Sequence, residues 1–312
     1  MKVIDVQNVY LKYPASKDDT IRGISFDVKQ GEIFGFLGPS GAGKSTVQKI
    51  LTGTLRDYRG SVRVFGDEIR HRTSRLLLKI IGVDFEFPNF YEKFTALENL
   101  KYFASIYSGR TTDPLELLEK VGLRPDAGKK VSSYSKGMKM RLGFVRSLLH
   151  DPKLLFLDEP TIGLDAVSKI AVRNIIREIN RDQGTTIILT THDTQDIEAL
   201  TNRILLIGKG RLLLDGDLQM LKKHYSSAKH ISIDYTPSPL CGRASDLLDI
   251  LENGLSVIKD MPGRLEVLAD TTSVSVSQVI SILNSRLEIN DLSITGTTMD
   301  EMVVSLYQEY SI

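Results

Sequence analysis

A nine-residue stretch near the N-terminus has the residue types of a phosphate-binding loop. It matches the pattern G-x-x-x-x-G-K-[ST], whose glycines let the backbone turn tightly so that successive N–H groups point at phosphate oxygens. In that pattern we expect Lys44 to reach the β- and γ-phosphates and Ser45 to place its hydroxyl on Mg²⁺. The residues expected to bind the nucleotide are Gly38, Pro39, Ser40, Gly41, Ala42, Gly43, Lys44, Ser45 and Thr46.

Two adjacent carboxylates follow an apolar run further along the chain. The run at residues 154–157 predicts a buried strand, and Asp158 and Glu159 stand directly after it. Such a strand end in P-loop enzymes places an aspartate beside the Mg²⁺, which is the role we expect for Asp158. We expect Glu159 to face the γ-phosphate and to polarise an attacking water as general base. These residues predict hydrolysis of a nucleoside triphosphate.

The flanking segments predict how the loop and the carboxylates are positioned. Residues 32–37 form a short apolar run typical of a buried strand, and residues 46–51 continue as a helix whose N-terminus favours an anion. Further strands and helices alternate, and the expected segments are 153–157, 167–181, 185–190, 195–201 and 203–207. This alternation predicts an α/β fold, a P-loop NTPase with a mostly parallel sheet.

Three other regions complete the expected fold. Strands expected near the N-terminus, including 21–28 and 60–66, have the glycine-bounded or alternating pattern of antiparallel strands. Helical spacing of apolar residues predicts a helical subdomain at about 87–149. The composition changes after residue 222, so we expect a nucleotide-binding domain at 1–222 and an accessory α+β domain at 223–312. The second domain has the β-α-β-β-α-β order of ferredoxin-like folds, with its first helix expected at 244–252.

The composition limits the class of protein. The chain has 312 residues and a net charge of +1, which gives no global sign of binding to nucleic acid. The single cysteine, Cys241, excludes an intramolecular disulfide and fits a reducing compartment. No apolar run approaches the roughly 18 residues of a membrane span, so any work at a membrane is expected to need a partner.

Five short motifs occur in one order along the chain, and together they are specific although each later motif alone is weak. After the P-loop come Y-S-K-G-M at residues 134–138, D-E-P-T at 158–161, G-L-D at 163–165 and T-T-H-D at 190–193. The ordered set resembles the nucleotide-binding subunits of ABC transporters, and the resemblance covers about residues 1–220.

The resemblance implies further site residues. Tyr13 corresponds to the aromatic residue that stacks on adenine; Tyr10 is the alternative, and an ordinary core tyrosine is another. Ser135 and Gly137 correspond to signature residues that hold the γ-phosphate of ATP bound to the opposite subunit. His192 corresponds to the switch histidine that contacts the γ-phosphate. Asp165 corresponds to a residue that communicates across the dimer, and it could equally be a helix N-cap.

Two departures from the family pattern stand out. The family has a glutamine that contacts Mg²⁺ after the strand following the P-loop helix, and here the matching residue is Glu86, with Asp84 as a less favoured alternative. A carboxylate can still bind Mg²⁺. In the signature, Tyr134, Lys136 and Met138 replace the usual leucine, glycine and glutamine. We expect Lys136 either to add a cation near the polyphosphate or to point to solvent.

The signature form, the single cassette and the C-terminal extension resemble ATPases of ABC-2-type exporters. That resemblance implies a dimer of nucleotide-binding subunits that sandwiches ATP and Mg²⁺ and drives a separate, polytopic membrane permease. It implies a peripheral location on the cytoplasmic face of the cell membrane, and no nucleic-acid partner is expected. The alternative is a soluble ABC-type ATPase that acts on a ribosome or a nucleic acid. Candidate contacts with the permease, which could be core residues instead, are Phe87, Phe90, Tyr91 and Phe94.

Overall fold

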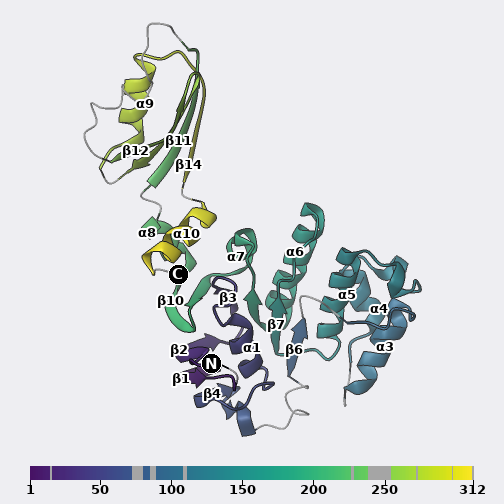
Figure 1. The fold of residues 1–312 in the computed structure, drawn as a ribbon. Helices are drawn as coiled ribbons and strands as arrows, with labels where there is room; N and C mark the ends of the chain where they lie inside the picture. Colours follow the sequence, from purple (N-terminus) through teal and green to yellow (C-terminus); the bar gives the residue numbers. More distant parts are fainter. Residues whose placement is uncertain are drawn as a thin grey trace. The chain divides into compact units, whose positions relative to one another are not determined.

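In the computed structural model, the chain divides into two compact units, residues 1–218 and 219–311 (Figure 1). No helix in the described part of the chain is long and apolar enough to span a bilayer. The described residues are 1–14, 16–71, 80–84, 89–107, 111–225, 228–237, 254–271, 273–296 and 298–310.

An antiparallel sheet forms one layer of the first unit. Its strand order is β2-β1-β4-β5, and buried and exposed residues alternate along much of β1 and β2, as expected for a sheet with one face in the core. The strands are β1 (Lys2–Leu11), β2 (Ile21–Lys29), β4 (Arg59–Val64) and β5 (Asp67–Glu68).

A second sheet of six strands has the order β10-β9-β3-β8-β7-β6. All its pairings are parallel except the hairpin β9–β10, which confirms the predicted mostly parallel sheet. The strands β7 and β8 are apolar and almost wholly buried, as in sheets covered on both faces. The strands are β3 (Ile33–Leu37), β6 (Ile81–Asp84), β7 (Leu154–Asp158), β8 (Thr186–Thr190), β9 (Arg203–Gly208) and β10 (Arg211–Asp217).

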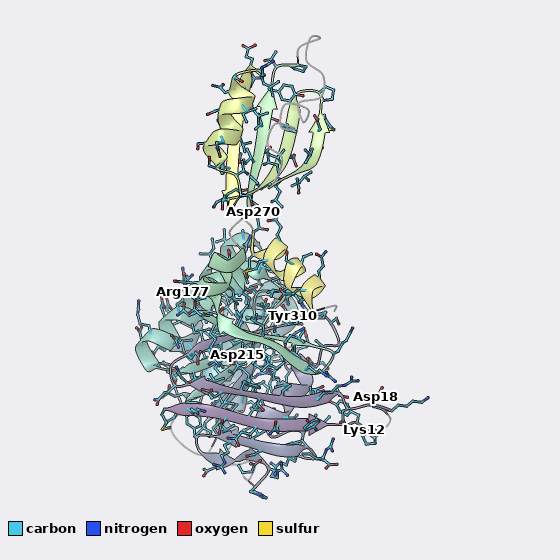
Figure 2. The ribbon with its side chains drawn as sticks, turned by 90° about the vertical axis from the view of Figure 1, so that its left-hand side faces the viewer. Lys12, Asp18, Arg177, Asp215, Asp270 and Tyr310 are labelled. Atoms are coloured by element: carbon cyan, nitrogen blue, oxygen red, sulfur yellow. The ribbon has the colours of Figure 1, made fainter. Side chains whose placement is uncertain are left out.

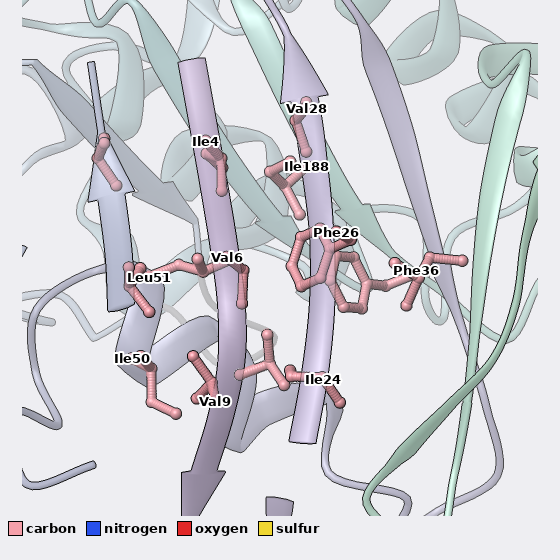
Figure 3. Close-up of a cluster of buried hydrophobic side chains, with 14 of the residues drawn as sticks. Ile4, Val6, Val9, Ile24, Phe26, Val28, Phe36, Ile50, Leu51 and Ile188 are labelled. Carbon is pink, nitrogen blue, oxygen red and sulfur yellow. The ribbon is translucent and has the colours of Figure 1, made fainter. Parts of the chain in front are cut away.

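Aromatic rings join the two sheets. The ring of Phe26 on β2 stacks on Phe34 of β3 at 6.0 Å between centroids, and it meets Phe36 edge to face at 5.5 Å. Ile50 and Leu51 of the P-loop helix extend the same buried cluster (Figure 3). The helix that carries the phosphate loop is therefore fixed to both sheets by apolar packing.

The hairpin of β9 and β10 was not predicted from the sequence. Its turn, Lys209-Gly210, has φ of 48° and 75°, the positive values that two-residue hairpin turns require. Arg203 on β9 donates to both carboxylate oxygens of Asp215 on β10, at 2.6 and 2.7 Å (Asp215 is labelled in Figure 2). This paired contact holds the outer strand against the sheet.

Three helices form the predicted helical insertion. They are grouped together in Figure 1, and α5 lies against β6. Thr95 caps the first of them in a reciprocal capping box with Glu98. The helices of the first unit are α1 (Lys44–Leu51), α3 (Ala96–Ile106), α4 (Pro114–Lys120), α5 (Lys136–Leu148), α6 (Ala166–Gln183) and α7 (Thr194–Leu200).

The second unit contains a four-stranded antiparallel sheet in the order β12-β13-β11-β14. The first strand is central, as in ferredoxin-like folds, and α9 contributes Val279 and Leu283 to the apolar cluster with Ile231 and Val267. The helix expected at 244–252 lies outside the described residues. The elements are α8 (Leu218–Tyr225), β11 (Ala228–Tyr235), β12 (Leu255–Met261), β13 (Arg264–Asp270), α9 (Val276–Asn284), β14 (Ile289–Gly296) and α10 (Met299–Glu309).

Candidate functional site

The P-loop joins the carboxyl end of β3 to the N-terminus of α1. Gly38 has φ of 152°, and a Cβ there would lie 2.3 Å from the carbonyl oxygen of Ile207. Gly43 caps α1 with φ of 111°, and a Cβ would lie 2.8 Å from Cδ1 of Ile21. Both positions therefore require glycine. The first turn of α1 carries no acidic residue, so its N-terminal dipole is available to an anion.

Lys44 lies folded over the loop from which it projects. Its Nζ donates to the carbonyl oxygens of Gly38 at 2.6 Å and Pro39 at 3.1 Å. Burial lowers the pKa of Lys44, and the negative charges of Glu159 and Asp158 act in the opposite direction. The ammonium group therefore lies within electrostatic range of both predicted acidic residues.

Asp158 and Glu159 lie at the carboxyl end of β7, beside β8. The hydroxyl of Thr190 donates to Asp158 Oδ1 at 2.5 Å and so orients that carboxylate. The backbone N–H of Glu159 donates to the carbonyl of Thr190 at 2.9 Å. Glu159 has φ of 52°, a conformation that non-glycine residues rarely adopt and that often occurs at functional sites.

Glu159 is paired with His192. The backbone N–H of His192 donates to Glu159 Oε2 at 3.2 Å, and its ring Nε2 lies 3.4 Å from Oε1. Glu159 is only 9% exposed, and this burial raises the pKa of its carboxyl to about 7, with Asp158 adding to the shift. The His192 N–H and Lys44 partly offset it. The structure thus brings together Lys44, the adjacent pair Asp158 and Glu159, and His192, which come from three segments far apart in the sequence.

The two candidate tyrosines have different surroundings. The Tyr13 hydroxyl lies 3.4 Å from Thr46 Oγ1 of the P-loop, and the side chain is partly buried against the N-terminal core. Tyr10 lies on β1, where its ring faces Gly23 and the Arg59 guanidinium lies 5.0 Å from the ring centroid. Only Tyr13 of the two therefore contacts the phosphate loop.

The signature residues and Asp165 lie at helix N-termini. Ser135 caps α5 by accepting from the Met138 N–H at 3.2 Å, and Asp165 caps α6 by accepting from the Ser168 N–H at 2.9 Å. The backbone N–H and the hydroxyl of Ser168 both donate to the Asp165 carboxylate, and these two bonds lower its pKa. The structure therefore places Asp165 at the helix N-cap that the sequence offered as its alternative, and Ser135 is also an N-cap; both positions are compatible with a further role in a dimer.

The segment around Gly163 lies against the signature segment of the same copy. A Cβ at Gly137 would lie 3.1 Å from Leu164 Cδ2, and one at Gly163 would lie 2.9 Å from Lys136 Nζ. Lys136 is exposed but extends across Gly163. The Lys136 side chain therefore extends over the Gly163 backbone in this structure.

Glu86 and Phe87 lie outside the described residues. Asp84, the alternative to Glu86, is buried at the end of β6 and is close enough to Arg146 of α5 to interact with it electrostatically. Burial lowers the pKa of Arg146, and the charge of Asp84 acts in the opposite direction.

The predicted aromatic contacts are partly exposed. Tyr91 is 47% and Phe94 is 44% exposed, and Tyr102 of α3 joins them with 45% of its surface exposed. Phe90 meets Phe103 edge to face at 6.2 Å, and the Arg146 guanidinium is 5.2 Å from the Phe90 ring centroid. Exposed apolar groups of this kind mark candidate interaction surfaces.

Two residues that organise the site, Thr190 and Asp196, were not predicted from the sequence. Thr190 was quoted within a motif without a role, although it orients Asp158. Asp196 on α7 was not considered, although it is fully buried. An acidic residue among the apolar residues of a short predicted helix was the available signal for Asp196.

Comparison with known proteins gives the family. Residues 21–162 match the family described as ABC transporter. A fluoroquinolones export ATP-binding protein of Mycobacterium tuberculosis is 46% identical over 235 residues, which are 75% of this chain and 77% of the relative. The bacitracin transport ATP-binding protein BcrA of Bacillus licheniformis is 36% identical over 224 residues, covering 72% and 71% of the two chains.

Solved structures agree with this relationship. The dimeric, post-hydrolysis ATP-binding cassette MJ0796 bound to ADP and Pi aligns with a TM-score of 0.63 and 25% identity, over 69% of this chain and 98% of that chain. The chain therefore belongs to the ABC transporter family as an ATP-binding cassette ATPase.

Proposed function

We propose that two copies of this chain close over two ATP molecules with Mg²⁺ and that hydrolysis drives a separate membrane permease that exports a drug, an ion or a peptide. One observation carries the proposal: a buried carboxylate, Glu159, is held against His192 and lies within the field of Lys44. A carboxylate with a pKa near 7 beside a phosphate-binding loop suits the general base of phosphoryl transfer to water.

The residues around Asp158 fit a magnesium ion. The part of the chain that the structure describes holds no group of three acidic or histidine ligands that could bind a metal by itself. Mg²⁺ in nucleotide sites, however, takes one or two protein oxygens together with phosphate oxygens and water. Asp158, oriented by Thr190, and the Ser45 hydroxyl would supply the protein oxygens, with Glu86 as a further expected ligand. Bound Mg²⁺ would neutralise charge on the phosphates.

The remaining residues have distinct roles in the proposed hydrolysis. Lys44 exchanges the carbonyls of Gly38 and Pro39 for phosphate oxygens when ATP binds. Glu159 accepts the proton of the attacking water, and His192 fixes the Glu159 carboxylate and contacts the γ-phosphate. Tyr13 stacks on the adenine next to the loop, because its hydroxyl already contacts Thr46.

A second copy completes each site in this proposal. Ser135 and Gly137 lie at the N-terminus of α5, where the Ser135 hydroxyl and free backbone N–H groups are suited to a γ-phosphate. Asp165 would connect the two sites across the dimer. The dimeric MJ0796 cassette supports this arrangement for the present chain.

The membrane partner is proposed from the relatives and the exposed aromatic residues. Relatives are described as proteins of fluoroquinolones export, bacitracin transport and Nod factor export. Tyr91, Phe94 and Tyr102 offer an apolar contact for a cytoplasmic segment of the permease, so we place the subunit peripherally on the cytoplasmic face of the cell membrane. We propose that the accessory domain at 223–312 packs at the dimer. A ribosomal or nucleic-acid role is not favoured, because these relatives are transport proteins.

Two experiments test the proposal. The variant Glu159→Gln removes the base and keeps the shape of the side chain, so we expect ATP to bind with unchanged affinity while turnover falls by about 10²–10⁴-fold. Hydrolysis at the wild-type rate would refute the assignment of Glu159. Affinity purification from detergent-solubilised membranes should recover a polytopic protein, whereas recovery of ribosomes or DNA would overturn the transporter role.

A further inference from the structure

Asp196 on α7, the helix that follows the loop with His192, carries a fully buried carboxylate. Its side chain is 0% exposed. It accepts from Arg173 Nε at 2.6 Å, from the Thr161 hydroxyl at 2.5 Å and from the Thr191 hydroxyl at 3.4 Å. A buried carboxylate is costly unless a cation and hydrogen-bond donors surround it, and here they do.

The partners of Asp196 belong to the two loops that carry the predicted hydrolytic residues. Thr161 follows Glu159 by two positions, and Thr191 directly precedes His192. The Thr161 hydroxyl donates to Asp196, and the Thr191 hydroxyl, which also interacts with Glu159, lies 3.4 Å from the same carboxylate. Asp196 therefore ties the segment after β7 to the segment after β8. The Glu159–His192 contact of 3.4 Å is formed between these two segments.

Helix α6 completes the connection. Arg173 lies between Asp196 and Asp193, with its Nη2 3.6 Å from Asp193 Oδ1, and Lys169 also pairs with Asp193 at 2.5 Å. Asp193 is the residue after His192 and the N-cap of α7. The loop with His192 is thus fixed from both sides, by Thr191 through Asp196 and by Asp193 through α6.

We propose that Asp196 is a positioning residue for ATP hydrolysis, which sets the separation of Glu159 and His192 without touching the nucleotide. The inference rests on the proposed function, because it assumes that these two residues act on the γ-phosphate and the attacking water. An error of about 1 Å in the position of a reacting group can cost roughly 10²-fold in rate. The P-loop makes none of the three bonds to Asp196 described above, so nucleotide binding should not depend on this residue.

The variant Asp196→Asn tests the proposal because it keeps the size of the side chain. It replaces one acceptor oxygen with an NH₂ group and removes the negative charge. We expect kcat to fall at least tenfold, while KM for ATP and the Kd measured by calorimetry with ATP change less than twofold. Thr161→Val removes a single hydroxyl and leaves the Arg173–Asp196 pair intact, and we expect kcat to fall about three- to fivefold. Asp182→Asn makes the same substitution at an exposed acid of the neighbouring helix α6, and as the control it should leave kcat unchanged.

The outcomes separate the possibilities. Retention of kcat within twofold in both Asp196→Asn and Thr161→Val would overturn the proposal, as would a loss of kcat matched by an equal loss of ATP affinity. If Asp196→Asn does not fold, as judged by thermal unfolding, Thr161→Val decides. The proposed function is tested separately by Glu159→Gln, so its failure would be seen as normal turnover in that variant.

Discussion

Substitution of Lys44 by methionine tests the geometry of the P-loop before any question of hydrolysis. In the structure, Lys44 Nζ is bonded to two loop carbonyls, at 2.6 and 3.1 Å. Binding of ATP must break these two bonds and form bonds from Lys44 to phosphate. Only the difference in free energy between the phosphate bonds and the carbonyl bonds therefore contributes to affinity. Hydrogen bonds to charged groups contribute about 1.5–3 kcal/mol each, and phosphate bonds to an ammonium lie at the upper end of that range.

The expected loss follows from that difference. Two bonds that each gain about 1–1.5 kcal/mol on exchange give a net contribution of about 2–3 kcal/mol. A loss of that size corresponds to a roughly 30- to 150-fold weaker Kd for ATP in Lys44→Met. Lys49→Met, at an exposed position of the same helix, is the control and should bind like the wild type.

The assay is calorimetric titration with ATP of both variants and the wild type, each checked for a normal unfolding midpoint in urea. A Kd for Lys44→Met within threefold of the wild type would refute the reasoning, because the exchange of carbonyl for phosphate would then contribute nothing.

Two further predictions concern the adenine-binding tyrosine, Tyr13, and the buried His150. Tyr13→Ala should weaken ATP binding about 5- to 150-fold, since stacking on a base contributes about 1–3 kcal/mol, while Tyr10→Ala should not; equal titration curves for the two would contradict this. Burial lowers the pKa of His150, so near and below its ordinary pKa of about 6.5 the unfolded chain binds more protons at this residue than the folded chain, and His150 lowers the free energy of unfolding as pH decreases from 7.5 to 5.5. The raised pKa of Glu159 acts in the opposite direction in this range but is common to wild type and variant. The free energy of unfolding of the wild type relative to that of His150→Phe, which keeps an aromatic ring against Tyr107, should therefore fall as pH decreases in urea unfolding, and an identical pH dependence of the two proteins would contradict the burial argument.

Much of the cassette could be predicted because its local signals agree with its tertiary structure. The apolar run before Gly38 forms β3, and the run before Asp158 forms β7, each fully packed between covering layers. Glycine at 38 is explained by the carbonyl of Ile207, a contact that only the folded chain reveals. The sequence motif predicted the P-loop, and the packing against Ile207 explains why residue 38 is a glycine.

The rest of the site depends on contacts between distant segments. The sequence offers Asp196 as one acidic residue on a short helix, and its three partners at 161, 173 and 191 become visible only when α6, α7 and the loops pack together. The β9–β10 hairpin was missed because its Lys209-Gly210 turn is a weaker signal than Asn-Gly or Asp-Gly. Likewise, the contact of the Lys136 side chain with Gly163 joins two motifs that the sequence shows only as separate segments.

In the proposed dimer, each ATP site combines the P-loop of one copy with Ser135 and Gly137 of the other. Sedimentation velocity of Glu159→Gln, which should bind ATP without turning it over, tests this arrangement most directly. With saturating ATP and Mg²⁺ we predict a shift from monomer to dimer, which Ser135→Arg in the same chain abolishes. Identical sedimentation with and without ATP would contradict a site completed by Ser135 and Gly137 of a second copy.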